Sequence, residues 1–196
     1  MKYIIAIIAG ALLSGLSGCA NIGDWYDESY SYARSTRLTD HYQLSRMNVW
    51  TLPLDSRIYV ATEPMNTKSV LKMKISESAY LAFNSVFGFV TRAEKPASYD
   101  DSLRQAKKAG FEYILYPKLI HSQDTVSTWE EAQAKQRKPL GLDQAVIQLI
   151  LAQTNGYVVD IVNISGQSGL LTFYADQPLD LIKAPISDYA LALAAR

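Results

Sequence analysis

Hydrophobic and polar residues alternate along positions 47–196 with the periods that strands and helices require. Runs of β-branched and aromatic residues predict three strands, at 57–61, 89–91 and 111–116. An apolar stripe at i, i+3 and i+4 predicts a helix at 76–87. A Ser-x-x-Asp start followed by lysines and a glycine predicts a second helix at 98–109. We expect a further short strand at 170–174 and a final helix at 185–195.

The clearest turn signal is Asn155-Gly156, which separates two long apolar runs and predicts an antiparallel hairpin over 145–164. A two-residue type I′ turn would place Gln148 opposite Asn163 and Ile150 opposite Ile161, so that polar residues meet and aliphatic residues meet. The whole order, β-α-β-α-β-β-β-α, predicts an α/β (α+β) fold in which helices pack on a mixed sheet.

The N-terminus has the pattern of a secretion signal, with Lys2 followed by an apolar run that is shorter than the roughly 20 residues of a membrane span. Leu16-Ser17-Gly18-Cys19 resembles the lipobox of bacterial lipoproteins, in which the cysteine carries the lipid and becomes the first residue. The resemblance implies lipidation of Cys19. Because Ala20 rather than an aspartate follows, it also implies sorting to the outer membrane. The alternative is an ordinary signal peptide with an unmodified cysteine.

Three parts of the chain are therefore expected: a signal peptide at 1–18, a lipidated N-terminus and tether at 19–46, and a single periplasmic domain at 47–196. The tether segment is polar and its hydrophobic residues follow neither helical nor strand periodicity, yet it is rich in tyrosine. We expect these rings either to pack on the edge of the domain or to contact a partner or the membrane surface.

Composition narrows the possible functions. A content of 48% hydrophobic and 11% aromatic residues excludes a disordered chain, and a single cysteine excludes an internal disulfide. Lys and Arg together number 19, as do Asp and Glu, so the formal net charge is zero. A chain without surplus positive charge does not have the composition of a nucleic-acid binder, and we expect none to be bound.

Candidate catalytic and metal-binding groups are few. Neither His41 nor His121 has a cysteine, histidine or carboxylate at the spacing of zinc ligands, so we expect no metal and no cofactor. His121 and Asp124 offer half of a hydrolase dyad, but the mature chain has no Gly-x-Ser-x-Gly motif to supply the nucleophile. The sequence therefore predicts a protein that is not an enzyme.

A long polar segment, 127–142, separates the third strand from the hairpin, and connections of this kind often carry function. We interpret Trp129, Lys135, Arg137 and Lys138 as partner-binding residues, with the indole as an anchor and the three cations facing an anionic partner. The alternative is a solvated charged helix that covers an edge of the sheet.

Two resemblances to known families follow from these patterns. The element order, the strand that follows Ala109-Gly110 and the Thr154-Asn155-Gly156 turn resemble the envelope domain shared by LpoB, CsgG and the N-terminal domain of TolB. From the lipobox to its end, the chain also resembles the uncharacterised bacterial lipoproteins of domain of unknown function 4823. The segments that carry this second likeness include 58–61, 146–149 and 169–174. Both resemblances imply a location and a fold, and neither implies a chemistry.

Two functional hypotheses remain open. The first is a non-catalytic interaction or assembly module of the cell envelope, lipid-anchored at the periplasmic face of the outer membrane and bound to an envelope protein. The second is a binding module for a cell-wall glycan or small ligand, which would use Trp129, Tyr113 and Tyr116. An exposed apolar surface favours the first, and a cleft lined by exposed aromatic rings favours the second.

Overall fold

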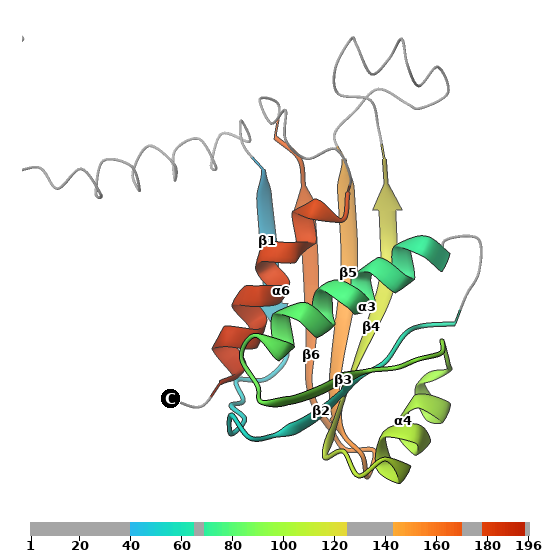
Figure 1. Cartoon of the computed structure of the whole chain (residues 1–196). Coiled ribbons are helices and arrows are strands. Elements are labelled where there is room, and N and C mark those ends of the chain that lie inside the picture. The colour runs from blue at the N-terminus through green and yellow to red at the C-terminus, as the bar shows by residue number, and fades with distance from the viewer. Residues whose placement is uncertain (1–39, 65–68, 125–142, 170–177, 195–196) are drawn as a thin grey trace, which may run out of the picture. The chain divides into compact units, whose positions relative to one another are not determined.

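The computed structural model describes residues 40–64, 69–124, 143–169 and 178–194 (Figure 1). Six strands form one sheet in the order β1-β6-β5-β4-β2-β3. The strands are β1 (His41–Arg46), β2 (Arg57–Val60), β3 (Phe89–Arg92), β4 (Tyr113–Gln123), β5 (Gln144–Gln153) and β6 (Val158–Gln167). The helices are α3 (Ser69–Asn84), α4 (Tyr99–Lys108) and α6 (Asp180–Leu193).

The sheet is mixed, as the sequence predicts. Strand β2 runs parallel to β3 and β4, whereas the pairs β4–β5, β5–β6 and β6–β1 are antiparallel. From β2 onward, the elements follow the predicted order β-α-β-α-β-β-β-α. The α+β class is therefore confirmed.

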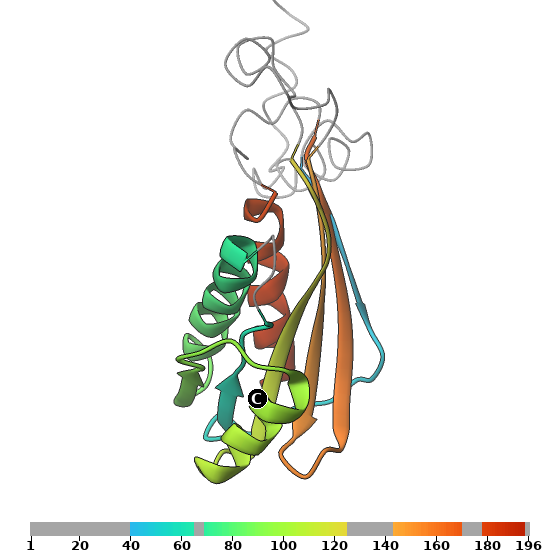
Figure 2. The same ribbon diagram turned by 90° about the vertical axis from the view of Figure 1, so that its right-hand side faces the viewer.

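Helices α3 and α6 cover one face of the sheet, which Figure 2 shows edge-on. Their buried residues meet those of the strands in the main core, where Phe83 of α3 packs against Phe87 and against Tyr189 of α6, both with ring centroids 5.8 Å away. Helix α4 packs on the opposite face, where Ala106 joins Tyr59 and Ile114 in a smaller core. Because α4 is short, most of that second face carries no helix among the described residues.

The hairpin has the predicted register but a different turn. The Gly156 N–H donates to the Gln153 carbonyl (2.9 Å) and the Gln153 N–H donates to the Tyr157 carbonyl (2.8 Å), so the loop has three residues rather than two. Gly156 has φ 95°, the left-handed conformation that such a loop requires. A bulge at Val159 adds one residue to β6, and beyond it Ile150 again lies opposite Ile161.

Strand β1 corrects the predicted tether, which extended to residue 46. Residues 41–46 pair with 162–167 of β6 and form an edge of the sheet. Leu44 turns toward the core and its neighbours Gln43 and Ser45 are exposed, so the strand does alternate. With a single aliphatic residue in six, this alternation is too weak to stand out in the sequence.

Two helix boundaries also differ from the sequence prediction. Helix α3 begins at Ser69, so Ser76 lies inside the helix rather than at its N-cap. The Ser76 hydroxyl is buried and donates to the carbonyl of Ala61, the residue that follows β2 (2.9 Å), a contact that no local pattern reveals. Helix α6 begins at Asp180 and accommodates Pro185. The N-cap of α4 is as predicted, with the Asp101 N–H donating to the Ser98 hydroxyl (3.2 Å).

Candidate functional site

The predicted lipidation and partner-binding residues lie outside the described part of the chain. These are Cys19, Trp129, Lys135, Arg137 and Lys138. The strand expected at 170–174 lies outside it as well. Lipidation and the role of segment 127–142 therefore stay predictions.

The two tyrosines expected to line a ligand cleft are not exposed platforms. Tyr116 is 6% exposed, its hydroxyl lies 3.4 Å from the Ala97 carbonyl, and its ring meets Tyr99 edge-on. Burial, followed by the charge of Glu63, raises the pKa of Tyr116 to about 12. Tyr113 is half-buried against the main core. The buried Tyr116 ring is therefore not placed to stack on a sugar, whereas Tyr113 is partly accessible and lines a surface hollow with Asn155.

The remaining chemical candidates are dispersed. His121 is exposed on β4 opposite Val146. Among the described residues, no group of three or more His, Cys, Asp or Glu side chains is arranged to hold a metal ion. No helix in the described ranges combines the length and the apolar character needed to cross a membrane.

The open face of the sheet is lined by polar side chains from β1, β5 and β6. Along β5, buried aliphatic residues alternate with half-buried residues that point the other way. On this open side the Gln148 Nε2 donates to the Asn163 Oδ1 (3.0 Å), the cross-strand pair that the hairpin pattern predicts. The open face is thus ordered by amide contacts rather than by an apolar core.

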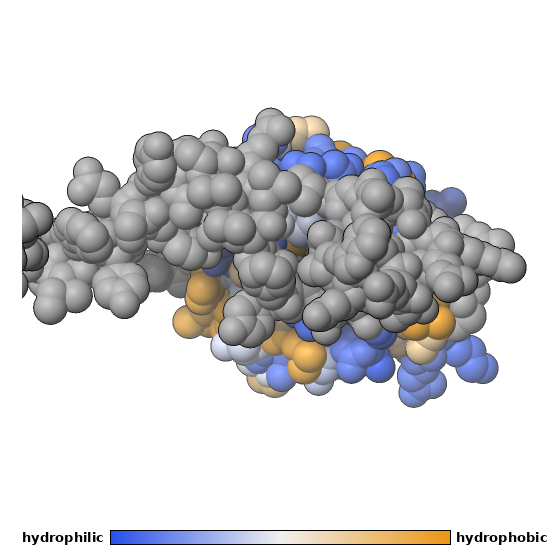
Figure 3. All heavy atoms as spheres, turned by 90° about the horizontal axis from the view of Figure 1, so that it is seen from above, coloured by the Kyte–Doolittle hydropathy of each residue, from blue (hydrophilic) through white to orange (hydrophobic). Residues whose placement is uncertain are grey.

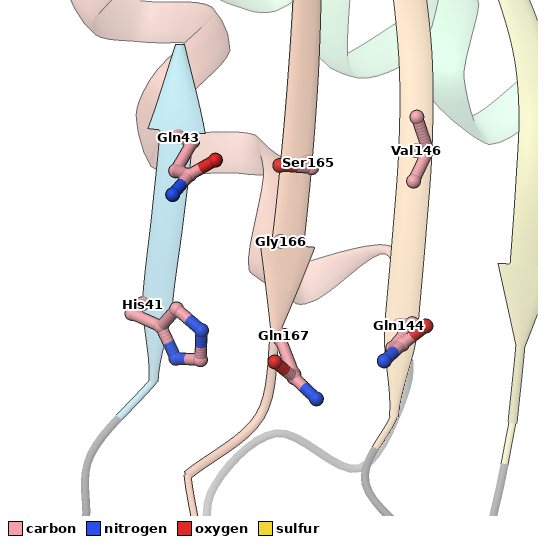
Figure 4. Close-up of a pocket in the computed structure, with 7 residues that line it drawn as sticks. All are labelled: His41, Gln43, Gln144, Val146, Ser165, Gly166 and Gln167. Carbon is pink, nitrogen blue, oxygen red and sulfur yellow. The ribbon is translucent and has the colours of Figure 1, made fainter. Parts of the chain in front are cut away.

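A hollow of about 230 Å³ lies at one end of this open face (Figure 4). Its seven lining residues include no Asp, Glu, Lys or Arg; they are His41, Gln43, Gln144, Val146, Ser165, Gly166 and Gln167. Within the described residues, the buried His41 Nδ1 has no hydrogen-bond partner. Amides, a hydroxyl and an imidazole suit a neutral polar ligand better than a charged one.

Buried polar contacts on the helix side attach β1 to the domain. The Asp160 carboxylate is fully buried and accepts from Arg46 Nε (2.8 Å), the Asn48 backbone N–H (3.0 Å) and the Tyr189 hydroxyl (3.3 Å). Burial and the Asp160 charge raise the pKa of Tyr189. The sequence contains an indication of this cluster. Asp160 and Val162 are two residues apart on β6 and so point to the same face of the sheet, where an unpaired carboxylate would not be expected.

The outer surface of α3 is the most apolar exposed helix face in the described structure. Val70, Met73 and Leu81 are 65%, 47% and 60% exposed, and Lys74 and Glu77 lie among them. Helix α3 is the outermost element on this side of the sheet (Figure 2). A shallow groove follows each flank of the helix, one against β3 and one against α6, and Glu77 and Leu81 line both grooves.

The exposed surface around this helix layer is mixed in character. Seen from above, hydrophobic and hydrophilic residues are interspersed along the visible rim of the helix side (Figure 3). A second group of exposed apolar side chains, Met47, Val49 and Trp50, follows β1. Exposed apolar residues therefore occur on the helix side and beside β1, whereas the open face of the sheet is mainly polar.

Comparison with known families assigns the chain. Residues 50–193 match Domain of unknown function (DUF4823). The chain belongs to this family. No curated protein matches the sequence. The match confirms the expected resemblance to domain of unknown function 4823 over these residues and brings no activity with it. The lipobox part of that resemblance lies outside the matched residues and stays a prediction.

Solved structures with a similar fold are dodecamers of PelC from Paraburkholderia phytofirmans. One has a TM-score of 0.58 and 13% sequence identity, and covers 80% of this chain and 100% of the PelC chain. A PelC variant with a leucine-to-methionine substitution has a TM-score of 0.59 and 12% identity over the same shares. At this identity the likeness extends to the fold alone. The expected likeness to LpoB, CsgG and TolB stays a prediction.

Proposed function

We propose that this family member is a membrane-anchored bacterial lipoprotein that acts as a non-catalytic assembly module of the cell envelope. The Leu16-Ser17-Gly18-Cys19 sequence supports the anchor. Several acyl chains on one cysteine are enough for stable attachment, since each buried methylene contributes about 0.8 kcal/mol. The periplasmic face of the outer membrane is the proposed location, because Ala20 follows the cysteine.

The observation that supports an assembly role most strongly is the outer face of α3. On the outward side of the helix the apolar side chains Val70, Met73 and Leu81 are exposed beside Lys74 and Glu77. An exposed apolar group of this kind is typical of a surface that binds another protein. Of the two tyrosines that the glycan-binding hypothesis would use, Tyr116 is buried and Tyr113 is half-buried against the main core. A similar fold occurs in PelC, which is a dodecamer, and this is consistent with a module that works by assembling.

Two measurements test this function in cells that produce the full chain. Mass spectrometry of the mature protein should find a lipid-modified Cys19 in the outer-membrane fraction, and Cys19→Ala should leave the protein unmodified and out of that fraction. Chemical crosslinking in whole envelopes should yield a discrete larger species that Leu81→Glu removes. Lys108→Glu on the exposed end of α4 is the matched control and should retain the species. Unmodified wild-type protein, or only monomers in every variant, contradicts the proposal.

A second function is favoured by the hollow on the open face of the sheet. The buried His41 Nδ1, unpartnered among the described residues, and the neighbouring Gln43 and Gln167 could bind a neutral polar ligand such as a cell-wall glycan. Titration with soluble glycan fragments, followed by NMR, tests this alternative. Shifts confined to β1, β5 and β6 that Gln167→Ala abolishes would support it, and an unchanged spectrum would contradict it.

A further inference from the structure

The exposed stripe on α3 has an order that is unusual for a solvated helix face. Val70, Lys74, Glu77 and Leu81 follow one another at spacings of four, three and four residues. These spacings keep all four side chains on one side of an α-helix, because each residue advances about 100°. Met73 lies beside them, and all five residues are exposed. The opposite side of the same helix contains the buried core residues.

The stripe is complementary to itself when it is read in reverse. Val70 and Leu81 are equidistant from the midpoint between Ile75 and Ser76, and so are Lys74 and Glu77. A second α3 related by a two-fold axis at that midpoint would therefore run antiparallel. Each apolar end would meet an apolar end, and each lysine would meet a glutamate. An isologous contact requires this kind of pairing.

We propose that α3 docks antiparallel on α3 of a second copy of this chain, with Val70 facing the partner's Leu81 and Lys74 facing the partner's Glu77. This inference rests on the proposed assembly function and names its partner. A parallel arrangement would set Lys74 against the partner's Lys74, and like charges at such distances repel. The charge order thus selects the antiparallel orientation. Removal of the signal peptide would take away one charge, that of Lys2, so the mature chain would have a net charge of −1 and its copies would repel each other only weakly over long range.

The surroundings of the stripe are compatible with a helix–helix contact. The grooves on both flanks of α3 can receive side chains of the partner helix, as ridges fit into grooves between packed helices. Within its own copy, Glu77 lies 3.9 Å from Arg92, and both side chains are exposed. A surface pair of this kind contributes little, so Glu77 remains able to face a lysine of the partner.

The contact is expected to be weak for the protein free in solution. The stripe from Val70 to Leu81 spans about 17 Å of helix. One helix pair of this length buries less than the roughly 800 Å² per partner of a standard stable interface. Anchoring both copies in one membrane raises their effective concentration, so the lipidated chain should associate more readily than a chain without the anchor.

Disulfide crosslinking of the full, lipidated chain tests the register. Cys19 is the only cysteine, and its lipidation leaves each variant with one free thiol at the introduced position. Val70→Cys and Leu81→Cys variants with different tags are produced in the same cells. A copper–phenanthroline catalyst then oxidises pairs of thiols to disulfides, with oxygen as the electron acceptor. The antiparallel register predicts strong crosslinking between the two variants and little within either one.

The other outcomes overturn the proposal. Crosslinks of Val70→Cys with itself and of Leu81→Cys with itself, without the mixed product, would mean parallel helices. Equal yields in every combination, or yields equal to those of Lys108→Cys on α4, would mean random collision.

A crosslink in the wild type, which has no introduced thiol, would instead mean that Cys19 is unmodified. The proposed anchor would then be wrong, while the comparison of Val70→Cys with Leu81→Cys could still be read in a Cys19→Ser background.

Charge reversal provides an independent measurement that does not rely on introduced thiols. Lys74→Glu and Glu77→Lys each place like charges opposite one another in two pairs, one on either side of the two-fold axis. Each variant should therefore reduce the dimer fraction roughly five-fold. The double variant Lys74→Glu/Glu77→Lys restores the order and should recover the dimer. Equal loss in the single and double variants would contradict the pairing. Circular dichroism checks that the exposed substitutions leave the fold unchanged.

Discussion

Both sides of helix α3 contain apolar residues, and these residues have opposite environments. On the inner face, Ile75 and Phe83 are 1% and 0% exposed; on the outer face, Val70 and Leu81 are 65% and 60% exposed. The inner face packs against α6 and the sheet, whereas the outer face also contains Lys74 and Glu77, and Glu77 lies 3.9 Å from Arg92 of β3. An apolar side chain on a helix therefore indicates a contact surface. It does not show whether the surface that covers it belongs to the same chain or to another one.

The inner face should account for most of the stability, so its truncation is the largest effect expected. Phe83→Ala removes a fully buried ring that contacts both Phe87 and Tyr189. The lost burial and the remaining cavity should lower the free energy of unfolding by about 3–5 kcal/mol. Urea denaturation followed by circular dichroism measures the change. A loss near that of an exposed substitution would mean that the two faces of α3 are not as different as their burial indicates.

The pH dependence of the free energy of unfolding tests the burial of Tyr189 on helix α6, against which the inner face of α3 packs. The pKa of Tyr189 is raised above its ordinary value of 10.0 by burial and by Asp160. The folded state therefore favours the neutral phenol, so its stabilisation is complete below pH 10 and is lost as the pH rises further. The loss should approach about 1.4 kcal/mol per pH unit for this one group.

Tyr189→Phe is the matched variant for this measurement. Between pH 9 and 11 its denaturation midpoint should fall less steeply than that of the wild type, because one titrating group is gone. Burial also raises the pKa of Tyr116, to about 12, so both proteins should still lose some stability as the pH rises. Parallel slopes in the wild type and in Tyr189→Phe would mean that Tyr189 is accessible to water in the folded state.

The smallest expected effect on folding comes from the outer face. Leu81→Ser replaces an exposed side chain that contributes no core contact, so the free energy of unfolding of the monomer should change by less than about 0.5 kcal/mol. The same substitution should lower the yield of the dimer in the membrane. A loss of stability close to that of Phe83→Ala would show that Leu81 packs within its own chain and is not available to a partner.

The fold could be predicted largely from local pattern, with instructive exceptions. The predicted register, with Gln148 opposite Asn163, is confirmed, although the two-residue turn from which it follows is wrong. The three-residue loop and the bulge at Val159 compensate for each other and leave the same register. The inner face of β6 selects that register, because any shift by one residue would expose its aliphatic side chains.

The candidate surfaces were harder to predict than the fold. The apolar stripe of α3 that is visible in the sequence is its buried face, with Ala79 and Phe83 both 0% exposed. Periodicity does not show how exposed the further apolar residues Val70, Met73 and Leu81 are on the other side of the helix. The start of α3 was missed because Ser76 has the features of an N-cap, and only its contact with the Ala61 carbonyl explains a buried serine inside the helix. The hollow at His41 does not follow from local pattern, because β1 contributes part of its lining and lies about a hundred residues before the β5–β6 hairpin that contributes the rest.

The sequence by itself determined the order of the elements from β2 onward, the α+β class and the hairpin register, because these follow from local periods and from the need to bury aliphatic side chains. Tertiary structure decided how residues far apart in the chain combine. It placed β1 on β6 through the buried Arg46–Asp160 pair, which joins positions 114 residues apart. It also decided how far each apolar residue of α3 is buried. That depends on where the sheet and α6 lie, so Ile75 and Phe83 are enclosed while Val70 and Leu81 are exposed.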